Sequence, residues 1–234
     1  MTNKLLHNNL SETMSDNNIP ILYSFVRCPY AMRARMALFE SRINCILREV
    51  DLRNKPSSML KISPKGTVPV LVLHAGQVIE ESLDIVDYAL KQNDLLTVQK
   101  YTKEEQGRIK ALIANNDIEF TKLLRIYKYP ERYPDHSQPA CKNEIQEKFL
   151  DKYEKMLEDN QFLFSLKSIA DIAILPFIRQ FAIVDQEWFY NSNYKNIISW
   201  LKMMTDNTGF QDIIMAKHDP WQESDKLVYL FSPN

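Results

Sequence analysis

Short apolar runs alternate with helically spaced apolar positions over the first ninety or so residues. The apolar runs predict four strands, at about 21–26, 46–50, 68–73 and 77–79. The spacing between them predicts three helices, over 29–41, from Pro56 to about Ile62 and from Glu80 to about Leu90. The order βαβ–α–ββα, with a parallel first half and a hairpin second half, is typical of a thioredoxin-like α/β domain.

Helical periodicity dominates after about residue 95, which predicts a second, all-α domain. Thr102, with Glu104 and Glu105 behind it, has the character of a helix start. A proline-punctuated loop over 129–139 precedes the next helix. We therefore divide the chain into a flexible arm, a thioredoxin-like domain, a linker and an all-α domain, at 1–19, 20–94, 95–101 and 102–234.

Ser168-Ile169-Ala170-Asp171 precedes a segment that is apolar nearly all round. Ser168 and Asp171 have the spacing of a reciprocal helix cap, and the helix behind them is expected to form the centre of the second domain. Asp171 can also be read as an acid catalyst, but capping explains the pattern better.

Composition narrows the class of protein. The 234 residues are 45% hydrophobic and 25% charged, with a formal net charge of −1, so we expect binding neither to nucleic acid nor to an anionic membrane surface. No apolar run approaches the roughly 20 residues of a spanning helix, and residues 1–20 lack the apolar core of a secretion signal. Three cysteines favour a reducing compartment, and we expect the cytoplasm.

Cys28 is the strongest candidate for chemistry. It lies where the first strand passes into a helix that begins at Pro29. The backbone N–H groups and dipole of a helix start favour the thiolate, which is the nucleophilic form. Ala31 stands where a dithiol motif would have its second cysteine, so Cys28 must act alone or with a small-molecule thiol. The alternative is a buried, inert cysteine.

The remaining cysteines and the histidines carry no assigned chemistry. Cys45 heads a strand and is read as a packing residue, and Cys141 lies at a loop–helix boundary, where exposure is expected. The four histidines stand at no ligand spacing to a cysteine or an acid, so we expect no metal site.

Four motifs together resemble a cytosolic glutathione transferase, and the cysteine most resembles the omega class. In chain order they are Cys28-Pro29-Tyr30, Asn54-Lys55-Pro56, Gly66-Thr67-Val68-Pro69-Val70-Leu71 and Glu81-Ser82. The Ser168–Asp171 box and the tail Asp219-Pro220-Trp221-Gln222 fit the same family, so the resemblance covers about 20–234. Arg27, before the cysteine, departs from the aromatic residue that is usual there.

The resemblance implies glutathione as co-substrate and assigns residues to it. Val68 would pair with the cysteinyl backbone of glutathione, with Pro69 in a cis peptide bond. Glu81 would bind the γ-glutamyl ammonium and Ser82 the carboxylate, and Lys55 would reach the glycyl carboxylate. Without the family, Glu81 and Ser82 read as a plain helix cap, Pro69 as an edge-strand proline and Lys55 as a solvated side chain.

The reaction that fits a lone thiol beside glutathione is thiol transfer through a Cys28–glutathione mixed disulfide. The same thiol chemistry fits the reduction of dehydroascorbate. The expected partners are glutathione and a small-molecule or protein disulfide acceptor. Conventional conjugation stays open, with Tyr23 or Ser24 as hydroxyl donor. A non-catalytic interaction protein also stays open. The family further implies a homodimer, and Trp188, Trp221, Tyr127 and Tyr133 are candidates for an acceptor pocket.

Overall fold

A computed structural model describes residues 19–93 and 100–231. These residues form two compact units, one made of the described residues up to Asn93 together with those from Asp212 onward, and the other ending at Gln211. The arm expected at 1–19 and most of the linker expected at 95–101 lie outside the described residues.

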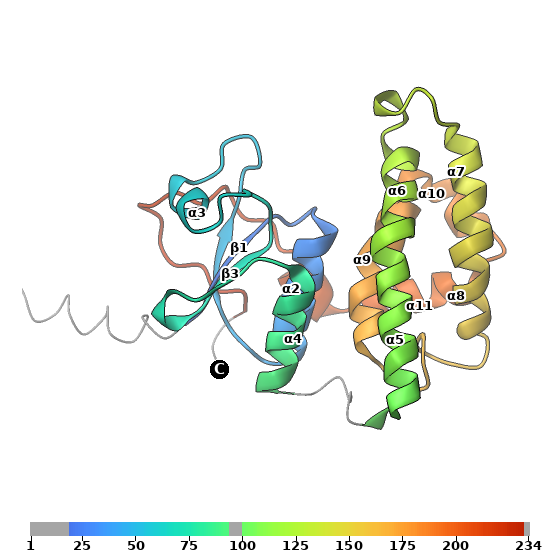
Figure 1. The fold of residues 1–234 in the computed structure, drawn as a ribbon, viewed down its shortest axis with the longest axis horizontal. Helices are drawn as coiled ribbons and strands as arrows, with labels where there is room; N and C mark the ends of the chain where they lie inside the picture. The colour runs from blue at the N-terminus through green and yellow to red at the C-terminus, as the bar shows by residue number, and fades with distance from the viewer. Residues whose placement is uncertain (1–18, 94–99, 232–234) are drawn as a thin grey trace, which may run out of the picture. The chain divides into compact units, whose positions relative to one another are not determined.

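The first unit is built on a four-stranded sheet in the order β2-β1-β3-β4 (Figure 1). Strand β1 runs parallel to β2 and antiparallel to β3, and β3 and β4 form an antiparallel hairpin. The strands span Ile21–Ser24 (β1), Ile46–Glu49 (β2), Val70–Val72 (β3) and Val78–Ile79 (β4). This is the expected mixed topology, with each strand shorter than its apolar run.

Three helices complete this part of the first unit, at Pro29–Glu40 (α2), Ser57–Ile62 (α3) and Ser82–Gln92 (α4). Helices α2 and α4 pack side by side. The expected turn at Ala75-Gly76 lies within a short 3-10 turn, His74–Gly76, in which Gly76 takes the positive φ of 80° that favours glycine. The thioredoxin-like reading of the first domain is confirmed.

The second unit is entirely helical in its described residues. Its helices are Lys103–Asn115 (α5), Thr121–Lys128 (α6), Gln138–Ile145 (α7), Asp151–Met156 (α8), Ile169–Val184 (α9), Gln186–Asn191 (α10) and Lys195–Thr205 (α11). Single π-helical turns, Asn116–Phe120 and Gln146–Leu150, join α5 to α6 and α7 to α8 without a break. Helix α7 begins inside the loop expected at 129–139, because Ser137 caps it and a proline is tolerated in its first turn.

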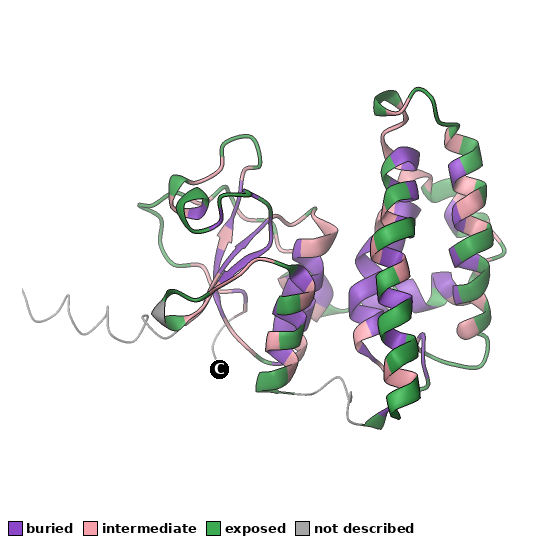
Figure 2. Ribbon diagram, viewed as in Figure 1, coloured by how far each residue is buried: buried purple, intermediate pink, exposed green. Residues whose placement is uncertain are grey.

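Helix α9 is the centre of the second unit, as its sequence predicts. Figure 2 shows it buried along most of its length, and residues from Ala170 to Ile178 are all buried. Pro176 lies inside the helix and is accommodated there.

The residues after Asp212 differ from the expected division, which assigned them to the helical domain. Leu47 N donates to Val228 O (2.6 Å) and Leu230 N to Cys45 O (2.9 Å), so this segment pairs with the outer edge of β2. An unpaired strand edge presents backbone donors and acceptors, and the C-terminal segment satisfies them. The segment therefore packs with the first unit.

Candidate functional site

Cys28 is the N-cap residue of α2. Its backbone is extended (φ −81°, ψ 122°), its side chain makes no capping hydrogen bond, and Pro29 follows as the first helical residue. The thiol is half-buried. A helix start attracts negative charge, so this position suits a thiolate.

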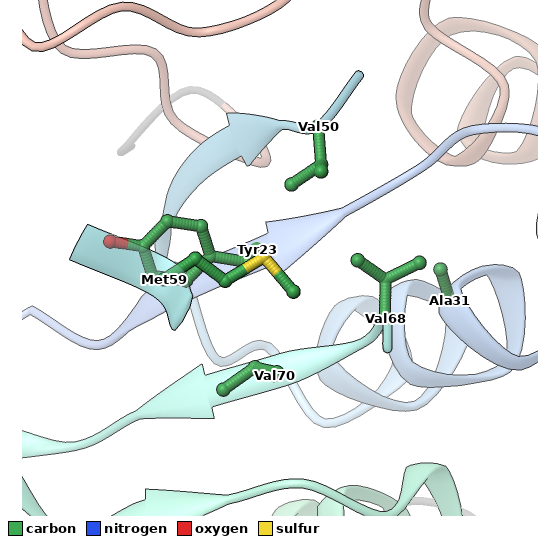
Figure 3. Packing of buried hydrophobic residues seen from close by; sticks show 6 residues of the cluster. All are labelled: Tyr23, Ala31, Val50, Met59, Val68 and Val70. Atoms are coloured by element: carbon green, nitrogen blue, oxygen red, sulfur yellow. The ribbon is translucent and has the colours of Figure 1, made fainter. Parts of the chain in front are cut away.

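The thiol lies against the backbone that leads into β3. Cys28 Sγ donates to Val68 O at 3.7 Å, and the Val68–Pro69 peptide bond is cis, as predicted. Figure 3 shows the Val68 side chain close to Ala31 of α2, within an apolar cluster that also contains Tyr23, Val50 and Met59. The structure thus brings Cys28 and Val68 together across 40 residues of chain.

Gly66 lets the chain approach Val68 in a tight bend. Its φ is +60°, and a Cβ atom there would lie 3.1 Å from Leu60 Cδ2 and 3.4 Å from Lys55 Nζ. Both values leave little room for a side chain, which explains glycine at this position. The half-buried Lys55 therefore lies over the bend two residues before Val68.

Glu81 and Ser82 open α4, and they differ in exposure. Glu81 holds the N-cap position without a capping hydrogen bond, and its 71%-exposed side chain forms an ion pair with Lys65 (2.6 Å). This hydrogen bond raises the pKa of Lys65. Ser82 is buried, and its Oγ accepts from Arg33 Nη1 (3.3 Å). The plain-cap reading of the pair is therefore wrong for both side chains.

Tyr23 and Ser24 are engaged in the core. Tyr23 is 2% exposed, and its hydroxyl accepts from Arg48 Nη1 and donates to Ser58 Oγ (3.4 Å). Ser24 Oγ is fully buried and accepts from Arg35 Nε (2.8 Å). Both hydroxyls have protein partners in the structure.

The other two thiols are buried. Burial raises the pKa of Cys45 to about 12 and also raises that of Cys141. The exposure expected for Cys141 is wrong, because α7 starts at Gln138 and turns this residue inward. Cys28 is the most accessible of the three cysteines.

Ser168 and Asp171 form the reciprocal cap of α9, as predicted. Asp171 Oδ2 accepts from Ser168 N (2.9 Å), and its Oδ1 accepts from Leu163 N (2.9 Å) and Trp200 Nε1 (3.0 Å). Burial raises the pKa of Asp171, and these hydrogen bonds oppose that shift. The carboxylate is fully buried and serves structure.

Within residues 19–93 and 100–231, no three His, Cys, Asp or Glu side chains gather as a metal site would require. None of the helices described is long and apolar enough to cross a bilayer. Of the aromatic candidates for an acceptor pocket, Tyr127 stacks on Phe181 in the core of the second unit, and Trp221 packs against Tyr23 in the first.

Sequence reasoning missed four charged residues near these positions. No role was assigned to Arg33 and Arg35, and both are fully buried in α2. Arg35 forms an ion pair with Glu49, and Lys65 forms one with Glu81. A signal was present for the buried pair, because charged residues interrupt both a short strand and an apolar helix.

Comparisons with known proteins agree with this architecture. Residues 22–95 match the family described as "Glutathione S-transferase, N-terminal domain". Glutathione S-transferase omega-1 of Rattus norvegicus is 28% identical over 164 residues, which are 68% of this chain and 66% of that protein. Glutathione S-transferase U24 of Arabidopsis thaliana is 28% identical over 222 residues, which are 91% of this chain and 94% of that protein. The chain spans just under two thirds of the rat protein.

Solved structures extend the similarity to the fold. A glutathione S-transferase from Rhodospirillum rubrum F11 superposes with a TM-score of 0.71 at 19% identity, covering 86% of this chain and 94% of its own. Glutathione transferase Omega 3C from Trametes versicolor superposes with a TM-score of 0.67 at 18% identity, covering 89% and 95%. The solved structures show that the chain has the glutathione transferase fold, and the family match over 22–95 together with the relatives supports its membership of the glutathione transferase superfamily.

Proposed function

We propose that the protein is a glutathione-dependent thiol transferase in which Cys28 is the nucleophile. The observation that carries the proposal is the placement of Cys28 Sγ at the start of α2, 3.7 Å from Val68 O beside the cis-proline bend. A thiolate at a helix start is a good nucleophile, and backbone next to a sheet can dock an extended peptide. Disulfide exchange with glutathione at a single cysteine, which the resemblance to the omega class implies, fits both features.

The reaction proceeds in two balanced exchanges. Cys28 thiolate attacks the glutathione sulfur of a glutathionylated substrate, the substrate S–S bond breaks, and the substrate thiolate leaves and takes up a proton. A second glutathione, as thiolate, then attacks the glutathione sulfur of the Cys28 mixed disulfide. Oxidised glutathione leaves, and Cys28 returns as the thiolate.

Glutathione itself is bound by the residues around the bend. Val68 offers its backbone to the cysteinyl residue, and Lys55 at the adjacent Gly66 offers a cation for the glycyl carboxylate. Ser82 and the start of α4 are suited to the γ-glutamyl carboxylate, and Glu81 to the ammonium. The Lys65–Glu81 ion pair is exposed and so is weak enough for the ammonium to compete with Lys65.

Conventional conjugation is the second candidate, and the engaged hydroxyls count against it. It requires a hydroxyl donor to the glutathione thiolate, yet the Tyr23 hydroxyl donates to Ser58 Oγ and Ser24 is fully buried. A non-catalytic interaction protein is tested by binding: failure of the full chain to be retained on immobilised glutathione would favour it.

Replacing the nucleophile tests the proposal. Cys28→Ala should lower glutathione-dependent reduction of a glutathionylated peptide by at least about 10³-fold, because the covalent intermediate is lost. The matched control is Cys141→Ala, which should keep turnover within about twofold. Activity retained in Cys28→Ala would rule the mechanism out.

Intact-mass and peptide mass spectrometry add a direct readout. After incubation with oxidised glutathione near pH 7.5, glutathione should be found on Cys28. Cys45 and Cys141 should remain unmodified until the chain is denatured, because burial raises their pKa values and shields them.

Two further proposals follow from the family. None of the three cysteines, all of which lie in the described residues, forms a disulfide, which supports a reducing compartment such as the cytoplasm. A homodimer is supported by exposed apolar surface such as Ile118, which is 71% exposed. Light scattering at micromolar concentration tests the dimer.

A further inference from the structure

Two fully buried arginines two positions apart on α2 make different contacts. Arg33 Nη1 donates to Ser82 Oγ (3.3 Å) at the start of α4. Arg35 reaches the sheet, where Nε donates to Ser24 Oγ (2.8 Å) and the guanidinium pairs with Glu49 of β2. Removing one partner of a buried ion pair is strongly destabilising, so the fold holds Arg35 and Glu49 in one arrangement.

The second carboxylate oxygen of Glu49 extends this pair to the turn that carries the nucleophile. Glu49 Oε1 accepts the backbone N–H of Val26 at 2.8 Å, two residues before Cys28. Within the same turn, Cys28 N donates to Phe25 O (2.9 Å). The turn is therefore held by a charge-assisted hydrogen bond from the Val26 N–H to a carboxylate that Arg35 itself holds.

The C-terminal segment joins the same network. Arg35 Nη1 donates to Ile214 O (3.2 Å), and Trp221 N donates to Glu49 O (2.8 Å). Trp221 also packs against the apolar cluster on which Cys28 lies. One buried pair thus connects β1, the Val26 turn, β2 and the C-terminal segment.

We propose that Arg35 and Glu49 are positioning residues for Cys28, which act by fixing the turn through Val26 so that Sγ stays beside Val68 O. The pair is neutral as a whole, so its main effect on the thiol is geometric. Its role in turnover rests on the proposed function, whereas its role in fixing the turn does not.

Three variants of the full chain separate an effect on the geometry of the Val26 turn from an effect of charge on the Cys28 thiol. Arg35→Met leaves a buried carboxylate, which would raise the pKa of the Cys28 thiol, and Glu49→Gln leaves a buried guanidinium, which would lower it. The double variant Arg35→Met with Glu49→Leu removes both charges and the bond to Val26, and a neutral apolar pair of similar volume is often tolerated. The pH midpoint of Cys28 alkylation by iodoacetamide reports the thiol pKa in each.

A positioning role predicts that kcat falls about tenfold or more in all three variants, with the KM for glutathione within about twofold. In the double variant the alkylation midpoint should match the wild type, and the Val26 amide should exchange hydrogen at least tenfold faster. Arg33→Met also removes a buried guanidinium from α2, and it should leave Val26 exchange within twofold.

A folded double variant with wild-type kcat would overturn the inference, as would rapid exchange of the Val26 amide in the unmodified protein. The latter measurement needs no variant, so it decides the matter even if the substitutions unfold the chain. Failure of the proposed function shows separately, as activity retained by Cys28→Ala.

Discussion

Helix starts in the two units are satisfied in different ways. In the described part of the first unit, the N-cap side chains of α2 and α4, Cys28 and Glu81, make no capping hydrogen bond. In the second unit, side chains at the N-cap accept backbone N–H groups at the starts of four helices. These are Thr102 for α5, Ser137 for α7, Ser168 for α9 and Asp185 for α10.

This contrast distinguishes helix starts that are available to bind a ligand from helix starts whose caps stabilise the fold. A helix start capped by its own side chain has less capacity left for a ligand, whereas one without such a cap can bind an anion. Two of the starts that lack a side-chain cap, those of α2 and α4, are the ones assigned to the thiolate and to the γ-glutamyl carboxylate. The caps of the second unit instead hold its core, and Asp171 alone joins three segments.

The largest expected effect is on the cap of α9. Asp171→Ala removes the acceptor for Leu163 N, Ser168 N and Trp200 Nε1 in a buried site, and should lower the free energy of unfolding by about 3 kcal/mol. Cys28→Ala should lower it by less than about 1 kcal/mol, since Cys28 caps nothing. Urea unfolding measures both, and equal losses would break the comparison.

The next effect concerns Ser82. Ser82→Ala should raise the KM for glutathione about tenfold, because a hydrogen bond to a charged carboxylate is lost, and should leave kcat within about twofold. Ser137→Ala is the matched control, because it removes a serine from a capped helix start. An unchanged KM in Ser82→Ala would remove this serine from the site.

A smaller effect is expected at α5. Thr102 Oγ1 accepts from Glu105 N (3.2 Å), and Glu105 Oε2 accepts from Thr102 N (2.8 Å). Thr102→Ala should therefore lower the free energy of unfolding by about 1 kcal/mol, and Thr102→Ser should restore most of it. Thermal unfolding checks this, with glutathione kinetics expected to stay unchanged in both variants.

The smallest expected effect is on the pH dependence of the free energy of unfolding, through His218 in the first unit. Burial, with the positive charge of Arg35 nearby, lowers the pKa of His218 below its usual 6.5. The unfolded chain then binds more protons than the folded chain just below pH 6.5, so stability is lost as the pH falls through the folded value. His218→Gln should reduce the fall in unfolding free energy between pH 7 and 5.5, and parallel curves would refute this.

Local signals in the sequence predicted much of the fold. Pro29 marks the start of α2, and the Ser168–Asp171 spacing gives the cap of α9. Each of these features depends on residues a few positions apart. The cis bond before Pro69 and a shared glutathione site for Cys28 and Val68 were expected only from the family resemblance, and the direct contact between Cys28 and Val68 was not predicted.

The features that were missed depend on residues far apart in the chain. The burial of Arg35 was not predicted, because its partners, Glu49 and Ile214, are 14 and 179 residues away. The pairing of Leu47 with Val228 likewise has no local signal. Cys141 was misread for a local reason, since the helix start at Ser137 was taken for loop.

The segment near Val228 that pairs with β2 also bears on aggregation. It covers the outer edge of the sheet, and the opposite edge is β4, which spans only Val78–Ile79. Edges of this kind offer little template for another molecule to add a strand. A chain shortened before Trp221 would uncover four residues of β2, and we expect it to aggregate through this edge beyond the oligomeric state of the intact chain.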